Sequence, residues 1–311
     1  MGNLVQFRAR SGELIGHPDH GFGFIRDPGV HGENGIYNGF HMHPASRIGA
    51  GQLPSMTKNV AYAPAVWNQS QTSSCTGHGL GGAETTTFAA QGKPLAAPVL
   101  PRVRYALGRA VDRTDPNTPL QDTGAQPNSL VRAAGLWGVV LESEDDGGRT
   151  ATSPDYAAYL TAHINDNPML GELEIGAKRL LVGYNAIADA DSQKSLKVQQ
   201  ALAGKYAVTV AVDAGSTAFQ SYDETKGPLD YTGDDPDHEV FLVDYGTVAA
   251  LLAAGLIPAS WQGLDPTAIL FLLQNSWGVG AGMWTISGRA WVTQSFVQNG
   301  CFNTLVVNLG L

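Results

Sequence analysis

The sequence is poor in cysteine and in charge, and each shortage excludes a class of protein. Only two of the 311 residues are cysteines, Cys75 and Cys301, too few for a disulfide framework or for a zinc site built from thiolates. Lysine and arginine number 19 against 28 aspartates and glutamates, a net charge of −9, whereas surfaces that bind nucleic acids are usually basic. We therefore expect neither a disulfide-stapled domain nor a nucleic-acid partner.

Long apolar runs are also missing. The opening stretch MGNLVQFRARSGELIG has no apolar core of signal-peptide length. The most apolar run, VAALLAAGLIPA at 248–259, is too short to span a bilayer and is typical of a short buried helix. The sequence therefore predicts a protein without a signal peptide or a membrane span, located in the cytoplasm or carried in a larger particle.

Glycine and histidine are abundant at the start of the chain. Residues 1–52 show no lasting helical or strand period, which predicts an irregular Gly/His-rich N-terminal extension. Five of the eight histidines lie there: His17, His20, His31, His41 and His43. Their spacing matches no familiar metal-ligand pattern, so a packed loop is favoured over a metal site. Inhibition of the rest of the chain, contact with an assembly partner and simple packing all stay open for this extension.

Residues 53–311 contain first helical patterns and then mainly strands. Helices are expected at 73–91, 99–111, 126–136, 154–164 and 194–205, and strands at 206–214, 237–246, 268–278 and 282–288. This order predicts an α+β fold in one domain, with a helical lobe at about 64–192 and a β-rich, barrel-like lobe at about 193–311. The cleft between the two lobes is the expected place for a site.

Cys75 lies in the stretch NQSQTSSCTGHGL, at the expected start of a helix. A thiol attacks as its thiolate, and a helix N-terminus or a neighbouring imidazolium lowers the pKa of a thiol. Four glycines follow, at positions 77, 79, 81 and 82. Each costs about 1 kcal/mol relative to alanine, so the helix needs close packing against its neighbours. From this stretch alone, a buried structural cysteine is as good an interpretation as a nucleophile.

Two other stretches offer a base and a residue to orient it. His238 opens the expected strand DHEVFLVDYG, where it can reach a thiol across a cleft between lobes. Asn275 ends the expected strand in LLQNSWGVGAG and is followed by Trp277, which can shield the pair from water. Taken singly, a surface histidine and a turn asparagine are the alternatives.

Together these stretches resemble the papain-like cysteine peptidases, in their prokaryotic or phage type. The family's pattern of Gln, five residues and Cys matches Gln69 and Cys75. Its Asp-His strand matches DHEVFLVDYG, and its Asn-Ser-Trp-Gly element matches NSWGVG. The three motifs occur in the family's order, and the resemblance extends over most of the chain after the extension.

The resemblance implies a two-lobed fold and hydrolysis of peptide bonds through a thioester acyl-enzyme, without a metal or organic cofactor. By this resemblance Cys75 is the nucleophile, His238 the general base and acid, and Asn275 the residue that orients the imidazole. Gln69 donates to the oxyanion hole together with the Cys75 backbone N–H, and Trp277 covers the His–Asn hydrogen bond. The expected partner is a peptide or protein substrate.

Glu239 is one of several departures from the family's pattern, which also include Thr76 after Cys75 and Ala281 in place of a tryptophan. Glu239 stands where the family has a small residue. Strand alternation directs its side chain away from His238, toward the interior of the lobe. A carboxyl group in that place needs a partner, and the sequence does not identify one.

A function of another class is also open. The chain can be a structural or interaction subunit of a larger assembly, such as a phage particle, that keeps a peptidase fold. The 52-residue extension favours this alternative, because a glycine-rich segment needs a surface to order it. An intact set of Gln69, Cys75, His238 and Asn275 favours the enzyme, because a scaffold has no need of them.

Overall fold

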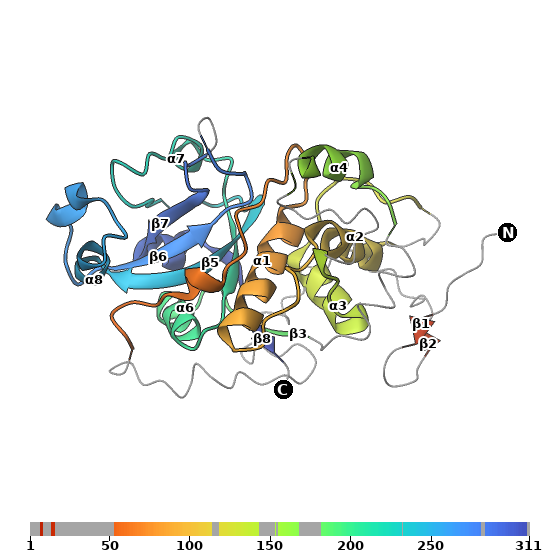
Figure 1. Cartoon of the computed structure of the whole chain (residues 1–311), viewed down its shortest axis with the longest axis horizontal. Helices are drawn as coiled ribbons and strands as arrows, with labels where there is room; N and C mark the ends of the chain where they lie inside the picture. The colour runs from red at the N-terminus through yellow and green to blue at the C-terminus, as the bar shows by residue number, and fades with distance from the viewer. Residues whose placement is uncertain are drawn as a thin grey trace.

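A central helix, α1 (Cys75–Ala90), separates a group of helices from a β-sheet in the computed structural model (Figure 1). Three helices lie on one side of it: α2 (Pro101–Asp112), α3 (Pro127–Trp137) and α4 (Tyr156–His163). The sheet lies on the other side, with α6 (Lys194–Ala203), α7 (Thr217–Gln220) and α8 (Val248–Ala253) around it. This arrangement confirms the predicted α+β fold with two lobes.

The structure describes residues 53–113, 118–142, 153, 155–167, 182–231, 233–280 and 284–309. It also describes two short strands near the start, β1 (Phe7–Arg8) and β2 (Leu14–Ile15), which pair antiparallel. The rest of the predicted extension, 1–52, lies outside the described residues, so its role stays a prediction.

Six strands form one antiparallel sheet in the order β3-β8-β4-β5-β6-β7. They are β3 (Val182–Ile187), β4 (Val208–Val212), β5 (His238–Thr247), β6 (Ile269–Gln274), β7 (Arg289–Thr293) and β8 (Phe302–Leu309). Every residue of β4 is buried, because the sheet is covered on both faces at its centre. Its sequence VTVAV is accordingly apolar almost throughout rather than alternating.

Most of the predicted elements are present, with ends shifted by a few residues, but one strand is placed differently and two strands were not predicted. The strand predicted at 282–288 lies instead at Arg289–Thr293, after a series of bends. Strand β3 belongs to the sheet although it falls within the predicted helical lobe, 64–192. It pairs with β8, a strand that the sequence did not predict and that lies far along the chain. Among the described strands no pairing joins the edge strands β3 and β7, so barrel-like closure is not confirmed.

The glycines of α1 allow its neighbours to approach unusually closely on both sides. A Cβ atom added at Gly77 would lie 2.4 Å from the Pro101 carbonyl oxygen of α2. One added at Gly79 would lie 2.8 Å from Cγ of Glu239 on β5. Both distances are shorter than carbon atoms tolerate, so only glycine permits this packing. Contacts with both lobes therefore outweigh the helix-propensity cost of about 1 kcal/mol per glycine.

A buried ion pair also fixes α1 against its neighbours. The Arg104 guanidinium of α2 donates to the Glu84 carboxylate of α1 over 2.8 Å, and both side chains are fully buried. The Tyr184 hydroxyl of β3 donates to the same carboxylate. Removing one member would leave a buried charge without its partner, which is strongly destabilising. The cluster therefore holds three elements in a fixed relation around the helix that carries Cys75.

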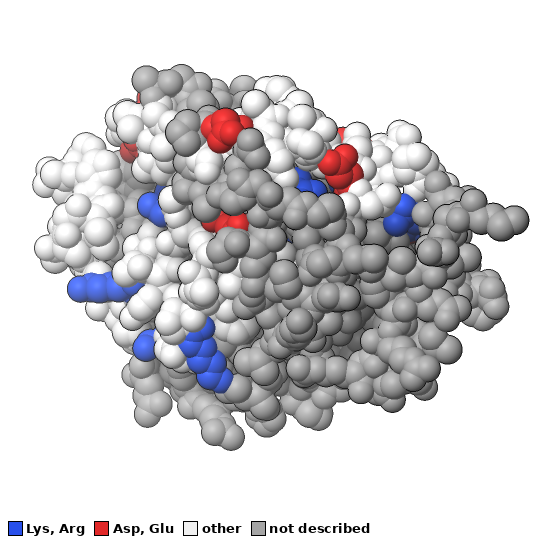
Figure 2. Space-filling model, turned by 45° about the vertical axis from the view of Figure 1, so that its right-hand side comes forward, with Lys and Arg blue, Asp and Glu red and all other residues white. Residues whose placement is uncertain are grey.

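Charged side chains are sparse on the surface. On the face shown in Figure 2, the described lysines, arginines, aspartates and glutamates are scattered and form no continuous patch of one sign. Among the helices of the described residues, none combines the length and the apolar character needed to cross a membrane.

The close packing of α1 predicts opposite effects for two glycine-to-alanine substitutions one turn apart. Gly77→Ala should lower the free energy of unfolding by about 1–3 kcal/mol, because the new methyl group collides with the backbone of α2. At Gly81 the nearest atom would be 3.5 Å away, an ordinary contact. Gly81→Ala should therefore leave stability unchanged or raise it by up to about 1 kcal/mol. Urea unfolding of the two variants measures the difference, and equal effects would contradict the packing described.

Candidate active site

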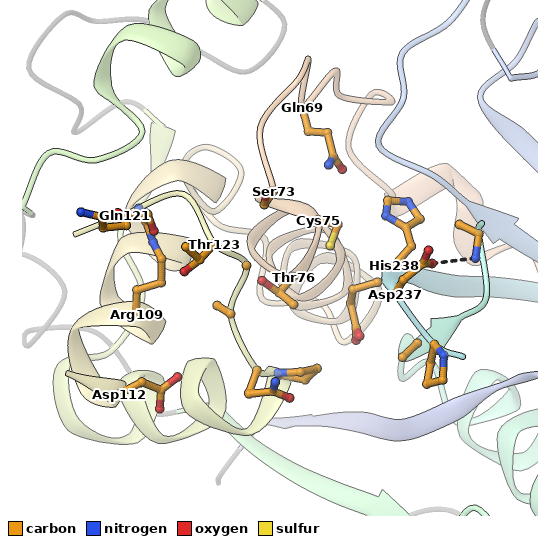
Figure 3. Close-up of a pocket in the computed structure, with 18 of the residues that line it drawn as sticks. Gln69, Ser73, Cys75, Thr76, Arg109, Asp112, Gln121, Thr123, Asp237 and His238 are labelled. Atoms are coloured by element: carbon orange, nitrogen blue, oxygen red, sulfur yellow. Dashed lines mark hydrogen bonds between the residues drawn. The ribbon is translucent and has the colours of Figure 1, made fainter. Parts of the chain in front are cut away.

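A cavity of about 800 Å³ opens at the N-terminal end of α1 (Figure 3). Cys75 and Gln69 line it from the α1 side, and His238 lines it from the start of β5. Its far wall comes from α2 and the segment between α2 and α3, which includes Arg109 and Gln121. The structure therefore brings three of the sequence-predicted site residues to one cavity between the lobes.

Cys75 is the first residue of α1, after the N-cap residue Ser74. At this position a backbone N–H has no acceptor within the helix, so it is free to bind a ligand. The turn before Cys75 is held by Asp122, which lies between α2 and α3. The Asp122 carboxylate accepts from Ser73 N at 3.0 Å and from the Tyr105 hydroxyl of α2 at 2.8 Å. The position of the thiol thus depends on contacts with α2 and with the segment between α2 and α3.

Gln69 is buried and is held at both ends of its amide group. Its Oε1 accepts from the Ser276 hydroxyl at 2.5 Å, and its Nε2 donates to the Thr72 carbonyl at 2.8 Å. The Gln69 backbone N–H also donates to the Ser276 carbonyl at 2.8 Å. An amide nitrogen carries two hydrogens, so one stays available to a ligand in the cavity that this residue lines.

His238 and Asn275 form a hydrogen bond of 2.7 Å between Nε2 and Oδ1. The same Asn275 oxygen accepts from the Ser276 backbone N–H at 2.7 Å, which identifies this atom as the acceptor. Nε2 of His238 therefore carries the ring proton, and Nδ1 is the unprotonated nitrogen of the neutral imidazole. An imidazole oriented in this way can accept a proton at Nδ1.

Aromatic rings enclose the histidine. The Trp277 ring lies against that of His238, with centroids 4.7 Å apart, and it meets Phe219 edge-on at 5.5 Å. Phe219 in turn stacks on Trp284 with centroids 4.5 Å apart. These rings limit the access of water to the imidazole, which is only 6% exposed. The structure thus places Trp277 where the resemblance predicted it.

Burial governs the charge state of both Cys75 and His238. It raises the pKa of the Cys75 thiol to about 11, although the backbone N–H groups of Glu239 and Thr76 offset part of the shift. Burial lowers the pKa of His238 to about 4, against the opposing effects of Asn275 and Asp237. The raised thiol pKa is opposite to the lowering that a helix N-terminus favours, and near neutral pH both groups are uncharged. The thiol proton has to move to His238 during a reaction.

Two features of the site were not foreseen. Ser276 links Gln69 to the segment that carries Asn275, and only its place within the NSWG motif indicated it. Asp237 lines the mouth of the cavity, where its carboxylate accepts from the Ala214 backbone N–H at 2.8 Å (Figure 3). Within the described residues, no group of three or more His, Cys, Asp or Glu side chains could hold a metal ion.

Known structures of cysteine proteases are similar to this chain. Procathepsin L 3 from the larval midgut of Tenebrio molitor shares 18% identity over 91% of this chain and 77% of its own, with a TM-score of 0.58. Xylellain, a cysteine protease from Xylella fastidiosa, shares 16% identity over 83% of this chain and 87% of its own, with a TM-score of 0.56. The bromelain protease of Ananas comosus shares 16% identity over 82% of this chain and 99% of its own, with a TM-score of 0.54.

These similarities show that the chain has the papain-like peptidase fold. No protein-family model matches the sequence, and no curated protein matches it. At 16–18% identity the likeness concerns the fold, so the roles of the site residues rest on the geometry described above.

The site predicts a large difference in reactivity between the two cysteines. Iodoacetamide should label Cys75, which is partly exposed, far faster than Cys301, which is fully buried. Because the pKa of Cys75 is raised to about 11, its labelling rate should climb steadily with pH, by about tenfold per unit below that value. Mass spectrometry of labelled peptides measures both effects. Preferential labelling of Cys301, or a rate that is already constant near neutral pH, would contradict this description.

Proposed function

We propose that the protein is a cysteine-type peptidase that hydrolyses peptide bonds through a thioester acyl-enzyme. The observation that carries the proposal is the hydrogen bond between His238 and Asn275 at a cavity that Cys75 and Gln69 also line. The papain-like fold supports it, because that fold is found in proteases that act through a cysteine. The substrate we propose is a peptide or protein chain.

The reaction begins from an uncharged thiol and an uncharged imidazole. As the Cys75 sulfur attacks the carbonyl carbon, Nδ1 of His238 takes the thiol proton, and the carbonyl oxygen becomes negative. The free amide hydrogen of Gln69 and the backbone N–H of Cys75 donate to that oxygen. The imidazolium then gives its proton to the leaving amine, and the C–N bond breaks to form the thioester. Water, deprotonated by His238, hydrolyses the thioester and restores the thiol.

The surroundings of His238 suit this proton transfer. Asn275 fixes the ring so that Nδ1 is the acceptor, and its oxygen stabilises the imidazolium that forms. The Asp237 carboxylate, at the mouth of the cavity, favours the same charged form. Burial disfavours it, so the imidazolium is a short-lived species of the reaction rather than the resting state.

A second candidate function follows from the electrostatics of the thiol. A cysteine whose pKa is raised to about 11 is also what an inactive, structural member of the fold would have. The chain would then be a structural or interaction subunit of a larger assembly, such as a phage particle, with residues 1–52 as a possible contact. Turnover of a peptide library separates the two candidates, and size-exclusion mass shows whether the chain assembles. We place either form in the cytoplasm or within a larger particle.

Substitution of Gln69 tests the oxyanion role most directly. Gln69→Ala should lower kcat/KM by about 10²–10³-fold, mainly through kcat, because the lost donor acts in the transition state. It should also lower stability by about 1–3 kcal/mol, since the side chain makes two hydrogen bonds within the protein. Steady-state kinetics and urea unfolding measure the two effects separately.

Two control variants accompany this test. Ser276→Ala removes the hydrogen bond to Oε1 of Gln69 and keeps the Gln69 amide donor. It should therefore lower stability by part of the amount seen for Gln69→Ala, and it should lower kcat much less. Gln71→Ala changes an exposed neighbour and should leave kcat/KM within a few-fold. Equal rates for Gln69→Ala and Gln71→Ala would rule out the assigned role, and an inactive wild-type chain would favour the structural subunit.

A further inference from the structure

A second and much smaller cavity lies behind the candidate active site. Its volume is about 10 Å³, close to the space that one water molecule occupies. Trp67, His78, Glu239 and Asn275 contribute to its lining. Glu239 also lines the large cavity that contains Cys75, so it lies between the two.

Five buried polar atoms of these four side chains have no hydrogen-bond partner among the described residues. They are Nε1 of Trp67, Nε2 of His78, both carboxyl oxygens of Glu239 and Nδ2 of Asn275. All four residues are at most 3% exposed, so bulk water does not reach them. An unsatisfied buried polar group costs about 1–3 kcal/mol, so five around one small cavity point to a shared partner.

The donors and acceptors at this cavity can be assigned from the bonds that the same groups make elsewhere. Nδ1 of His78 lies 2.9 Å from the Ser74 carbonyl oxygen and therefore donates to it, so Nε2 is an acceptor. Nε1 of Trp67 can only donate, and Nδ2 of Asn275 donates because the Asn275 oxygen already accepts from His238 and Ser276.

An uncharged Glu239 gives every donor and acceptor around the small cavity a partner, and a charged Glu239 does not. The neutral acid has one O–H to donate to Nε2 of His78 and a carbonyl oxygen that accepts. One water molecule can then accept from Trp67 and Asn275 and donate to the Glu239 oxygen. A Glu239 carboxylate has no proton to donate, so the two hydrogens of the water would face three acceptors, both carboxylate oxygens and Nε2 of His78, and one acceptor would stay without a donor.

The charges around Glu239 also favour the neutral acid. The titratable groups on the elements packed around it are Cys75 and His78 of α1, its chain neighbours Asp237 and His238, and Cys301 before β8. None is a cation near neutral pH, because burial lowers the pKa of both histidines to about 4. The neighbouring strands β4 and β6 carry no titratable side chain.

Burial has the corresponding effect on Glu239 itself. It raises the pKa of this carboxyl group to about 8, and the Thr209 hydroxyl nearby offsets part of the shift without a hydrogen bond of good geometry. The methylene groups of the side chain lie directly against α1, where only a glycine at position 79 leaves room for them. Helix α1 thus confines the side chain beside the small cavity.

We propose that Glu239 is a positioning residue of the candidate site: as an uncharged acid, it holds His78 and, through one internal water molecule, the amide group of Asn275. This inference rests on the proposed peptidase function. The water fixes the nitrogen of the Asn275 amide, so the oxygen of that amide stays directed at Nε2 of His238. Loss of the Glu239 proton removes a donor from the network and places a negative charge near Cys75, and that charge raises the pKa of the thiol.

The pH dependence of the reaction tests this proposal. In the wild-type protein, kcat/KM should fall as pH rises through about 8, where Glu239 loses its proton. Glu239→Gln has nearly the same size, cannot ionise and can still donate to His78. It should keep neutral-pH activity within about threefold and move the alkaline fall upward by at least about one pH unit. Asp235→Asn removes an exposed carboxylate three residues before β5 begins and should leave the whole profile unchanged.

Several results would overturn the proposal. An alkaline fall at the same pH in Glu239→Gln and wild type would do so, since a merely structural role for Glu239 predicts no such shift. If Glu239→Gln does not fold, His78→Asn keeps a donor for the Ser74 carbonyl and removes the acceptor at the cavity. It should lower kcat at least about tenfold with KM little changed, and an unchanged kcat would count against the network.

Two measurements separate this proposal from the peptidase assignment. The rate of Cys75 alkylation at pH 9 should be higher in Glu239→Gln than in wild type, whether or not any peptide is cleaved. A wild-type chain that cleaves no peptide would defeat the peptidase function, whereas equal alkylation rates would defeat the role of Glu239. A crystal structure that resolves ordered water should show one molecule bonded to Asn275 Nδ2, and a dry cavity would contradict the water-mediated link.

Discussion

The contact between α1 and its neighbours is the constraint on which the rest of the structure depends. Because α2 approaches at Gly77 and β5 at Gly79, the helix is held between the two lobes at distances that no other residue permits. The Cys75 thiol stands at the end of this helix, and His238 stands at the start of β5. Backbone packing therefore places the ends of the two elements that carry these groups.

Burial is the second general property of the site, and it disfavours the charged form of four of its side chains. It raises the pKa of Cys75 and Glu239 and lowers that of His78 and His238, so each is uncharged near neutral pH. In the resting site these four side chains are consequently neutral hydrogen-bonding groups. When the thiol proton moves, the Gln69 amide donor is directed at the carbonyl oxygen that becomes negative, and the Asn275 oxygen accepts from the imidazolium that forms.

The sequence was sufficient for the local part of this description. The motifs around Gln69, Cys75, His238 and Asn275 identified side chains that the structure then placed at one cavity or in direct contact, and the helix of residues 75–90 was predicted within two residues at its start. These features depend on residues that are close together in the chain or on a recognisable motif.

What depends on distant contacts could not be predicted. The pairing of β3 with β8 joins segments far apart in the chain, and neither strand has a distinctive local pattern. The raised pKa of Cys75 could not be predicted, because the sequence shows the helix N-terminus but not the depth of burial. Glu239 was seen to need a partner, and only the structure shows which polar groups surround it.

The place of β8 in the sheet has a consequence for the synthesis of the protein. Of the six strands it leaves the ribosome last, yet it lies between β3 and β4 rather than at an edge. Until it is made, β3 has no neighbour in the sheet, and one edge of β4 presents unpaired N–H and C=O groups. The nascent chain therefore has an open, aggregation-prone sheet edge beside the site until the last strand emerges and fills it.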